Sequence, residues 1–176
     1  GEIRASVTYK LKGSALHITH EASTDKATVL NMTNHSYFRL DGSESINEHQ
    51  LQLHCNHFLE TRENLLPTGS ILEVTDTEKD FRQARQIGPT RMDTPFVCHP
   101  EESAIAELHS DLSGIRMSVS SNQPGVVVFT PLSFAGICFE TQNFPDAPNF
   151  PDFPNSILLP GQSYKNRAVF DFDLVI

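Results

Sequence analysis

The sequence predicts an all-β protein built as a large antiparallel β-sandwich. Short segments with alternating apolar and polar residues recur along the chain, separated by turns rich in glycine, proline, asparagine and aspartate. The apolar run at residues 126–130 is typical of a strand that is covered on both faces. No long segment keeps the period of an amphipathic helix. These patterns favour two packed sheets in a single domain, residues 1–176.

Each strand is predicted from its alternation and from the turn that ends it. Residues 3–11 place Ile3, Val7 and Tyr9 on one face, which predicts a half-buried strand that ends at Gly13. Residues 16–20 are its expected hairpin partner, followed by a turn at residues 21–25. Residues 27–38 are expected to be extended. Further strands are predicted at residues 51–55, 71–74, 105–108, 115–119, 126–130, 137–139 and 168–176.

Three connections stand out between these strands. Residues 64–69 contain Pro-Thr-Gly and predict a turn. Residues 76–95 form a long polar connection, a feature that is often functional. The loop after residue 142 contains four prolines, at positions 145, 148, 151 and 154. Because proline fixes φ and lacks an N–H donor, this loop is expected to be stiff and to lie outside the central sheet.

Composition excludes several classes of partner. The formal net charge of −9, without a Lys/Arg-rich run, argues against nucleic acids and anionic membranes. No apolar run approaches the ~20 residues that span a bilayer, and no signal segment is recognisable. The three cysteines show no paired spacing, so we interpret them as reduced thiols in a cytoplasmic protein.

Glu140 is the first candidate for catalysis. It follows the apolar residues 137–139 and precedes the proline-rich loop, so a partly dry, preformed environment is expected around it. Such an environment raises the pKa of a carboxylate and suits it to act as a base or acid. The alternative is an ordinary exposed glutamate at the end of a strand.

A second candidate is the polar stretch TNHSYF at residues 33–38. The period of a strand places Thr33, His35 and Tyr37 on one face, where a polar stripe needs partners or a cleft. His35 suits a general acid because an imidazole titrates near neutral pH. A histidine whose hydrogen bonds are satisfied within the core is the alternative.

Asp93, at the end of the long polar connection, is either a turn residue or an acceptor for sugar hydroxyls. Metal binding is not expected. The histidines in the pairs 17/20 and 54/57 would point to opposite faces of a strand, and no cysteine or carboxylate cluster completes a tetrahedral set. No phosphate-binding glycine loop or nucleophile elbow is present. The sequence therefore predicts a site without metal or cofactor.

Several motifs, in order along the chain, resemble the aldose 1-epimerase (galactose mutarotase) family. They are TNHSYF, LDG (40–42), LPTG (66–69), DF (80–81), QPG (123–125), FETQNFPDAPN (139–149), LPG (159–161) and Tyr164. TNHSYF and ETQNFPDA are long and specific. The resemblance implies a supersandwich fold, of which this chain would be the C-terminal part. It also implies an isomerase that interconverts the α and β anomers of free hexoses such as galactose and glucose.

The resemblance assigns roles residue by residue. His35 would protonate the ring oxygen, and Glu140 would take the proton of the anomeric hydroxyl across a sugar-sized hollow. Asp93 would accept sugar hydroxyls, and Tyr37 would lie beside the substrate. The implied partner is a small-molecule sugar, with a missing N-terminal segment or a second chain to complete the fold.

The sequence departs from the family pattern at the N-terminal side, where the family's sugar-binding Arg and further His have no counterpart. Thr94-Pro95-Phe96 replaces His-Asn-Phe after the aspartate, and Val127 replaces a common glutamine. Two alternatives follow: a non-catalytic sugar-binding module or inactive fragment, and an epimerase of phosphorylated sugars. The second would use a cluster of arginines, at positions 82, 85 and 91.

Overall fold

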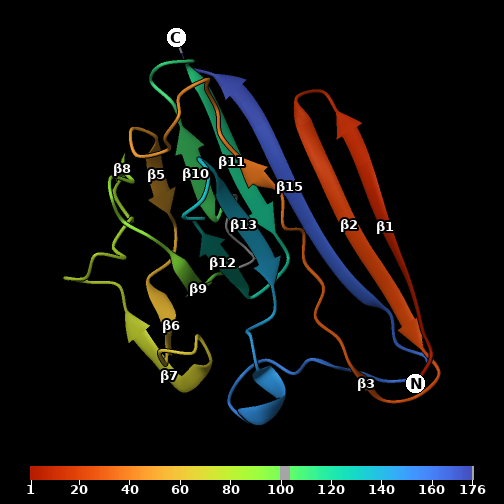
Figure 1. Ribbon diagram of the computed structural model, residues 1–176. Helices are drawn as coiled ribbons and strands as arrows, with labels where there is room; N and C mark the ends of the chain where they lie inside the picture. Colours follow the sequence, from red (N-terminus) through yellow and green to blue (C-terminus); the bar gives the residue numbers. More distant parts are fainter. Residues whose placement is uncertain (100–103, 176) are drawn as a thin grey trace.

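The computed structural model describes residues 1–99 and 104–175, which form two large antiparallel sheets packed face to face (Figure 1). The seven-stranded sheet has the order β1-β2-β15-β11-β10-β5-β8 and the six-stranded sheet the order β4-β13-β12-β9-β6-β7. The strands of the first are β1 (Ile3–Lys12), β2 (Ala15–Thr24), β15 (Tyr164–Leu174), β11 (Ile115–Ser121), β10 (Ala106–His109), β5 (Gln50–Leu53) and β8 (Arg85–Gln86). Those of the second are β4 (Tyr37–Phe38), β13 (Ile137–Gln142), β12 (Gly125–Phe129), β9 (Asp93–Val97), β6 (His57–Thr61) and β7 (Pro67–Glu73). The predicted β-sandwich is confirmed.

Two short strands, β3 (Thr28–Val29) and β14 (Ile157–Leu158), pair separately. Within the described residues the one helical element is a 3₁₀ turn at Ala147–Asn149. None of the helical structure in this part of the chain is long and apolar enough to cross a membrane.

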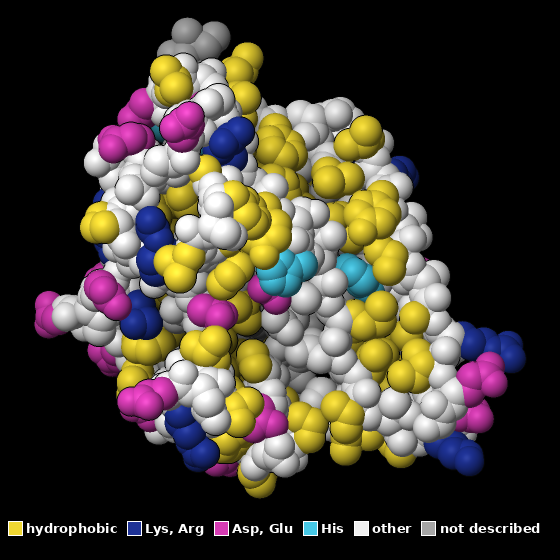
Figure 2. Space-filling model, viewed as in Figure 1, with side chains coloured by type: hydrophobic (Ala, Val, Ile, Leu, Met, Phe, Trp, Pro, Cys, Tyr) yellow, Lys and Arg dark blue, Asp and Glu magenta, His cyan; other side chains and the backbone are white. Residues whose placement is uncertain are grey.

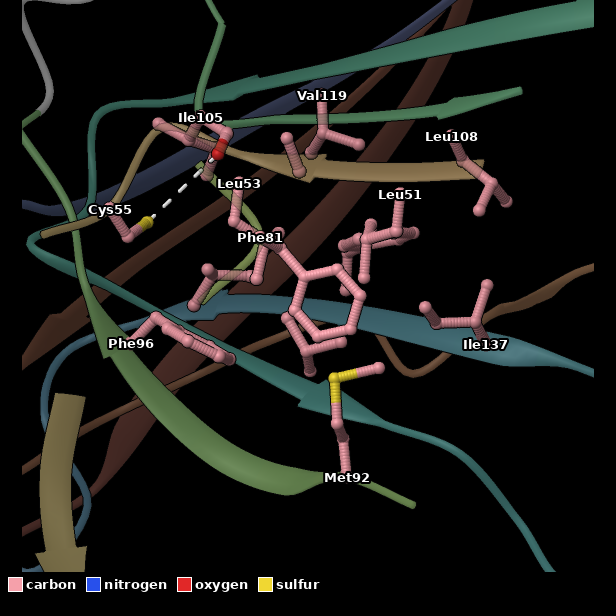
Figure 3. Close-up of a cluster of buried hydrophobic side chains, with 14 of the residues drawn as sticks. Leu51, Leu53, Cys55, Phe81, Met92, Phe96, Ile105, Leu108, Val119 and Ile137 are labelled. Atoms are coloured by element: carbon pink, nitrogen blue, oxygen red, sulfur yellow. Dashed lines mark hydrogen bonds between the residues drawn. The ribbon is translucent and has the colours of Figure 1, made fainter. Parts of the chain in front are cut away.

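The main core lies between the two sheets (Figure 3). Because side chains alternate along a strand, Leu51 and Leu53 of β5 point inward from one sheet and meet Phe96 of β9 and Val126 and Val128 of β12 from the other. All five are buried. Burying each large apolar side chain stabilises the fold by about 1.5–3 kcal/mol, which makes this cluster the main source of stability.

A second, smaller cluster lies on the outer face of the six-stranded sheet. The proline-rich loop folds back so that Phe144, Ala147 and Phe153 are buried against Leu59 of β6. The rings of Phe144 and Phe153 meet edge to face, with centroids 5.2 Å apart. The loop thus covers one part of this outer face and leaves another part, which contains Glu140, beside it.

The N-terminal hairpin differs from the prediction in two respects. β2 extends to Thr24 and so includes most of residues 21–25. It does so because it is paired on both sides: Glu21 lies opposite Ser6 of β1 and opposite Lys165 of β15. The expected turn there is wrong. β1 is exposed along its whole length, so its apolar side chains are not buried by any described residue; Tyr9 and Leu11 are 62% and 77% exposed.

Other boundaries also differ. Residues 27–38 contain only β3 and β4, and the expected turn at 64–69 is shorter because β7 begins at Pro67. The connection at 76–95 contains β8, and Asp93 is the first residue of β9 rather than a loop residue. Pro95 is tolerated within β9 because β6 pairs only with residues 96 and 97. The final strand begins earlier than expected, at Tyr164, and Ile176 lies outside the described residues.

A buried carboxylate ties the loop after β4 to the seven-stranded sheet. Asp41 accepts hydrogen bonds from the hydroxyls of Ser43 and Ser110, and the ring of His49 accepts one from the Leu40 N–H. Burial acts to raise the pKa of Asp41, but these hydrogen bonds and the nearby His49 hold it at about 2. The carboxylate is therefore ionised in the folded protein over the whole physiological range.

Replacing Asp41 with asparagine is expected to lower the free energy of unfolding at neutral pH by about 1–3 kcal/mol, because buried donors lose a charged acceptor. The folded-state pKa is depressed, so the stabilisation is complete above the unfolded value of 3.8 and is lost as the pH falls through about 2. Urea unfolding at neutral and acidic pH measures this, with the exposed Asp152→Asn as control. A difference that stays constant with pH would contradict it.

Candidate functional site

The site is built on the outer face of β13. Glu140 lies within this strand, which continues to Gln142, so the expectation that the strand ends before Glu140 is wrong. Glu140 and Cys138 are two residues apart and therefore face the same side. β4 pairs with β13, with Tyr37 opposite Cys138, and this pairing brings the preceding residue pair Asn34–His35 over the strand.

The segment that carries His35 is irregular, yet side chains from distant strands fix it. Asn166 of β15 donates its amide to the carbonyls of Met32 and Thr141, each at 2.7 Å. The hydroxyl of Tyr164 accepts from the Met32 N–H and donates to its carbonyl. Thr33 also donates to the Thr141 carbonyl. These bonds replace the ladder that a strand would have made and hold the segment against β13.

The imidazole of His35 has a partner at each nitrogen. Its Nε2 lies 3.1 Å from Oε1 of Glu140, and its Nδ1 lies 3.5 Å from Sγ of Cys138. The rings of Tyr37 and Phe129 flank it, with centroids 5.1 and 5.9 Å away. The His35 side chain is 49% exposed and that of Glu140 only 13%. The imidazole therefore faces solvent above a more buried carboxylate.

The environment of Glu140 favours proton acceptance. Burial raises its pKa above the ordinary glutamate value, and the charge of Asp93 raises it further. His35 and a hydrogen bond from the Gln142 amide, 3.3 Å from Oε2, act in the opposite direction without overcoming this shift. A carboxylate with a raised pKa is a stronger base at neutral pH than an exposed one.

Asp93 and Tyr37 lie at the same site. Asp93 opens β9 opposite Phe129 of β12, is exposed, and acts electrostatically on Glu140. Tyr37 packs its ring against Phe134, with centroids 4.8 Å apart. On the face shown in Figure 2, histidine and acidic side chains gather near the centre, beside a hollow in the surface. The structure thus brings together all four residues that the sequence singled out.

Three features differ from expectation. His35 and Glu140 touch each other directly and do not face each other across a hollow. The sequence predicts no place in the site for Cys138, but Cys138 lies beside His35. Its position two residues before Glu140 predicts that the two side chains share one face of the strand. Phe129 was expected only as part of a covered strand, and its contact with His35 could not be read from the sequence.

A divalent metal could be considered at His35, Cys138 and Glu140, whose ligand atoms lie within 4.8 Å of one another. No other such group occurs among residues 1–99 and 104–175. The two partners of His35 are, however, at opposite nitrogens of its ring, and one ion binds only one of these. The three groups therefore do not converge on a single point.

Two of the three arginines considered for a phosphate are engaged elsewhere, and the third, the exposed Arg91, donates to the carbonyl of the neighbouring Thr90. Arg82 pairs with Asp80 at 2.6 Å. Arg85 donates to the carbonyls of Asp80 and Glu78 and lies over the ring of Phe81. These contacts stabilise the connection itself and do not form a phosphate-binding cluster.

Solved structures with the same fold define the class of protein. The GalM/aldose epimerase homologue from C. elegans superposes with a TM-score of 0.91 at 29% identity, covering 99% of this chain and 61% of that one. Galactose 1-epimerase from Lactobacillus acidophilus gives a TM-score of 0.86 at 27% identity, covering 99% and 58%. The fold is that of the galactose mutarotase-like β-sandwiches.

Sequence comparison gives the family. The model of the aldose 1-epimerase family matches residues 1–171, so the chain belongs to this family. Human galactose mutarotase is 34% identical over an alignment of 200 positions, gaps included, that covers 99% of this chain. The aldose 1-epimerase of Streptococcus thermophilus is 32% identical, with 98% of this chain covered. In both cases the chain spans 58% of the relative's length.

Proposed function

We propose that this chain carries the acid–base pair of an aldose 1-epimerase that interconverts the α and β anomers of free hexoses such as galactose and glucose. The observation that carries the proposal is the 3.1 Å contact between His35 Nε2 and Glu140 Oε1 at an open surface. The raised pKa of Glu140 supports its assignment as the base.

In the proposed reaction, His35 gives a proton to the ring oxygen O5 while Glu140 removes the proton of the hydroxyl on C1. The C1–O5 bond breaks and leaves an open-chain aldehyde. Rotation about the C1–C2 bond presents the other face of the carbonyl. Ring closure then returns one proton to His35 and one to O1, so the protein ends as it began.

The direct contact between acid and base suits this chemistry. O5 and O1 are bonded to the same carbon, so the groups that serve them must lie side by side and not at opposite ends of the sugar. A hexose that approaches from solvent would place its O1–C1–O5 edge against Nε2 and the carboxylate, and its two oxygens would replace their direct contact. The reaction needs no redox or electrophilic step beyond proton transfer, each positioned group contributing about 10²–10⁴-fold.

Polarimetry on freshly dissolved α-galactose and α-glucose tests the proposal. We expect the optical rotation to reach equilibrium faster with the protein than in buffer. The second candidate is a sugar-binding module without catalysis. Saturable sugar binding in calorimetry without faster mutarotation would establish it in place of the enzyme.

Three further assignments belong to the proposal. We treat the chain as one domain, supported by the single large buried cluster between the sheets. A cytoplasmic location is supported by Cys55 and Cys138, which are present as thiols. A further segment or a second chain would cover β1, as the exposure of Tyr9 and Leu11 suggests.

Replacing Asp93 with asparagine is expected to raise KM for the sugar about 5- to 100-fold, because a charged hydrogen-bond acceptor for hydroxyls is lost. Asp93 raises the pKa of Glu140, so its removal should also shift the acid limb of the kcat/KM profile to lower pH. Polarimetric pH profiles measure both effects. Asp152→Asn serves as a surface control, and an unchanged KM together with an unmoved acid limb would contradict the assignment.

A further inference from the structure

Among residues 1–99 and 104–175, Cys138 is the one close polar neighbour of His35 to which the acid–base reaction assigns no step. Its Sγ lies 3.5 Å from Nδ1 of His35, within the range for a hydrogen bond to sulfur. The side chain is fully buried beneath the ring and shares the face of β13 with Glu140. Glu140 contacts the other nitrogen, Nε2, and the flanking rings of Tyr37 and Phe129 pack against the imidazole.

At neutral pH the thiol of Cys138 keeps its proton. Burial, and then the charge of Glu140, raises the pKa of Cys138 to about 12. A neutral thiol is a weak donor through S–H and a weak acceptor through sulfur. It can therefore pair with Nδ1 whether or not that nitrogen carries a proton. A carboxylate at the same place could only accept, and would fix the proton on Nδ1.

We propose that Cys138 is a positioning residue for His35, whose thiol holds the imidazole through Nδ1 so that Nε2 faces Glu140 and the sugar. The inference rests on the proposed function for its catalytic consequence, whereas the contact itself is a property of the free protein. When Nδ1 carries a proton, that N–H donates to sulfur. When Nδ1 is bare, the S–H donates to it. A general acid that gives up the proton of Nε2 keeps the proton of Nδ1 in both of its protonation states, so the Nδ1–H donates to sulfur throughout the reaction. The S–H serves only the neutral tautomer of the free protein in which Nδ1 is bare.

The test compares Cys138→Ala, which removes the partner of Nδ1, with Cys138→Ser, whose hydroxyl can still donate and accept. The matched control is Cys55→Ala, which removes another fully buried thiol at a distance from the site. ¹⁵N NMR of the imidazole nitrogens, assigned with His35→Asn, reports which ring nitrogen of His35 is protonated. This readout does not require catalysis.

We expect Cys138→Ala to shift the ¹⁵N signals of His35 and to redistribute its tautomers, while Cys138→Ser and Cys55→Ala keep the wild-type pattern. In polarimetry, Cys138→Ala should lower kcat about 3- to 10-fold with little change in KM, the size expected for one weak hydrogen bond. Cys138→Ser should restore kcat to within about twofold of the wild type.

Unchanged His35 signals in Cys138→Ala would overturn the inference, and so would a loss in Cys138→Ser as large as that in Cys138→Ala while the protein stays folded by circular dichroism. If no variant and no wild-type protein accelerates mutarotation, the proposed function fails. The NMR comparison still decides the role of Cys138 in that case, so the two failures are distinguishable.

Discussion

Replacing Glu140 with glutamine is expected to lower kcat for hexose mutarotation by about 10²–10⁴-fold, the usual contribution of one general base. Glutamine has the same shape and keeps an oxygen near His35 Nε2, but an amide does not accept the O1 proton at neutral pH. KM should change little because the sugar-binding groups remain. Polarimetry over a range of galactose concentrations separates the two constants.

The chain offers a matched control for this substitution. Glu107 also lies on a strand, β10 of the other sheet, and also contacts a histidine, with His54 Nε2 at 3.4 Å. Glu107→Gln therefore removes a similar carboxylate from a similar pair and should leave kcat unchanged. If Glu140→Gln retained a rate close to that of Glu107→Gln, Glu140 would not be the base.

The stability of Glu140→Gln distinguishes lost chemistry from lost structure. A carboxyl whose pKa is raised on folding contributes stability at pH values below its unfolded pKa, and this contribution is lost as the pH rises through the folded value. At neutral pH the charged Glu140 thus weakens the fold, because burial raises its pKa. The glutamine variant should unfold at the same or a higher urea concentration than the wild type at neutral pH, even while it is inactive.

The regular parts of the fold could be predicted because alternation reports which residues share a face. The hairpin of β10 and β11 follows from apolar residues at every second position on both sides of a turn that ends at Gly114, whose φ of +70° favours glycine. Alternation does not report what covers a face. For this reason β1 was expected to be half-buried, although its apolar side chains are exposed.

The site could be predicted in its residues but not in its geometry. TNHSYF and ETQ indicated His35 and Glu140 through a family resemblance. Their direct contact depends on the pairing of β4 with β13 and on Asn166, which holds the intervening backbone from a strand near the other end of the chain. Such long-range contacts leave no local pattern. Cys138 was within reach of sequence reasoning, because its spacing from Glu140 alone places it on the same face.

Replacing His35 with asparagine is the second change for which a large effect is expected, again about 10²–10⁴-fold in kcat, because the ring oxygen loses its proton donor. The control is His54→Asn, which removes the histidine of the matched pair His54–Glu107. The double variant His35→Asn with Glu140→Gln should lose little more than either single variant, since acid and base act in the same event and their effects are not additive.

The pH profile tests the electrostatic role of His35, because the acid limb is expected to shift in a direction that a purely structural effect would not predict. His35 lowers the pKa of Glu140, whereas Asp93 raises it. The residual activity of His35→Asn should therefore show its acid limb at higher pH than the wild type, opposite to the shift expected for Asp93→Asn. Profiles that move in the same direction in both variants would contradict the electrostatic coupling of the three residues. Opposite shifts would show that one carboxylate, Glu140, is the group whose protonation limits the reaction.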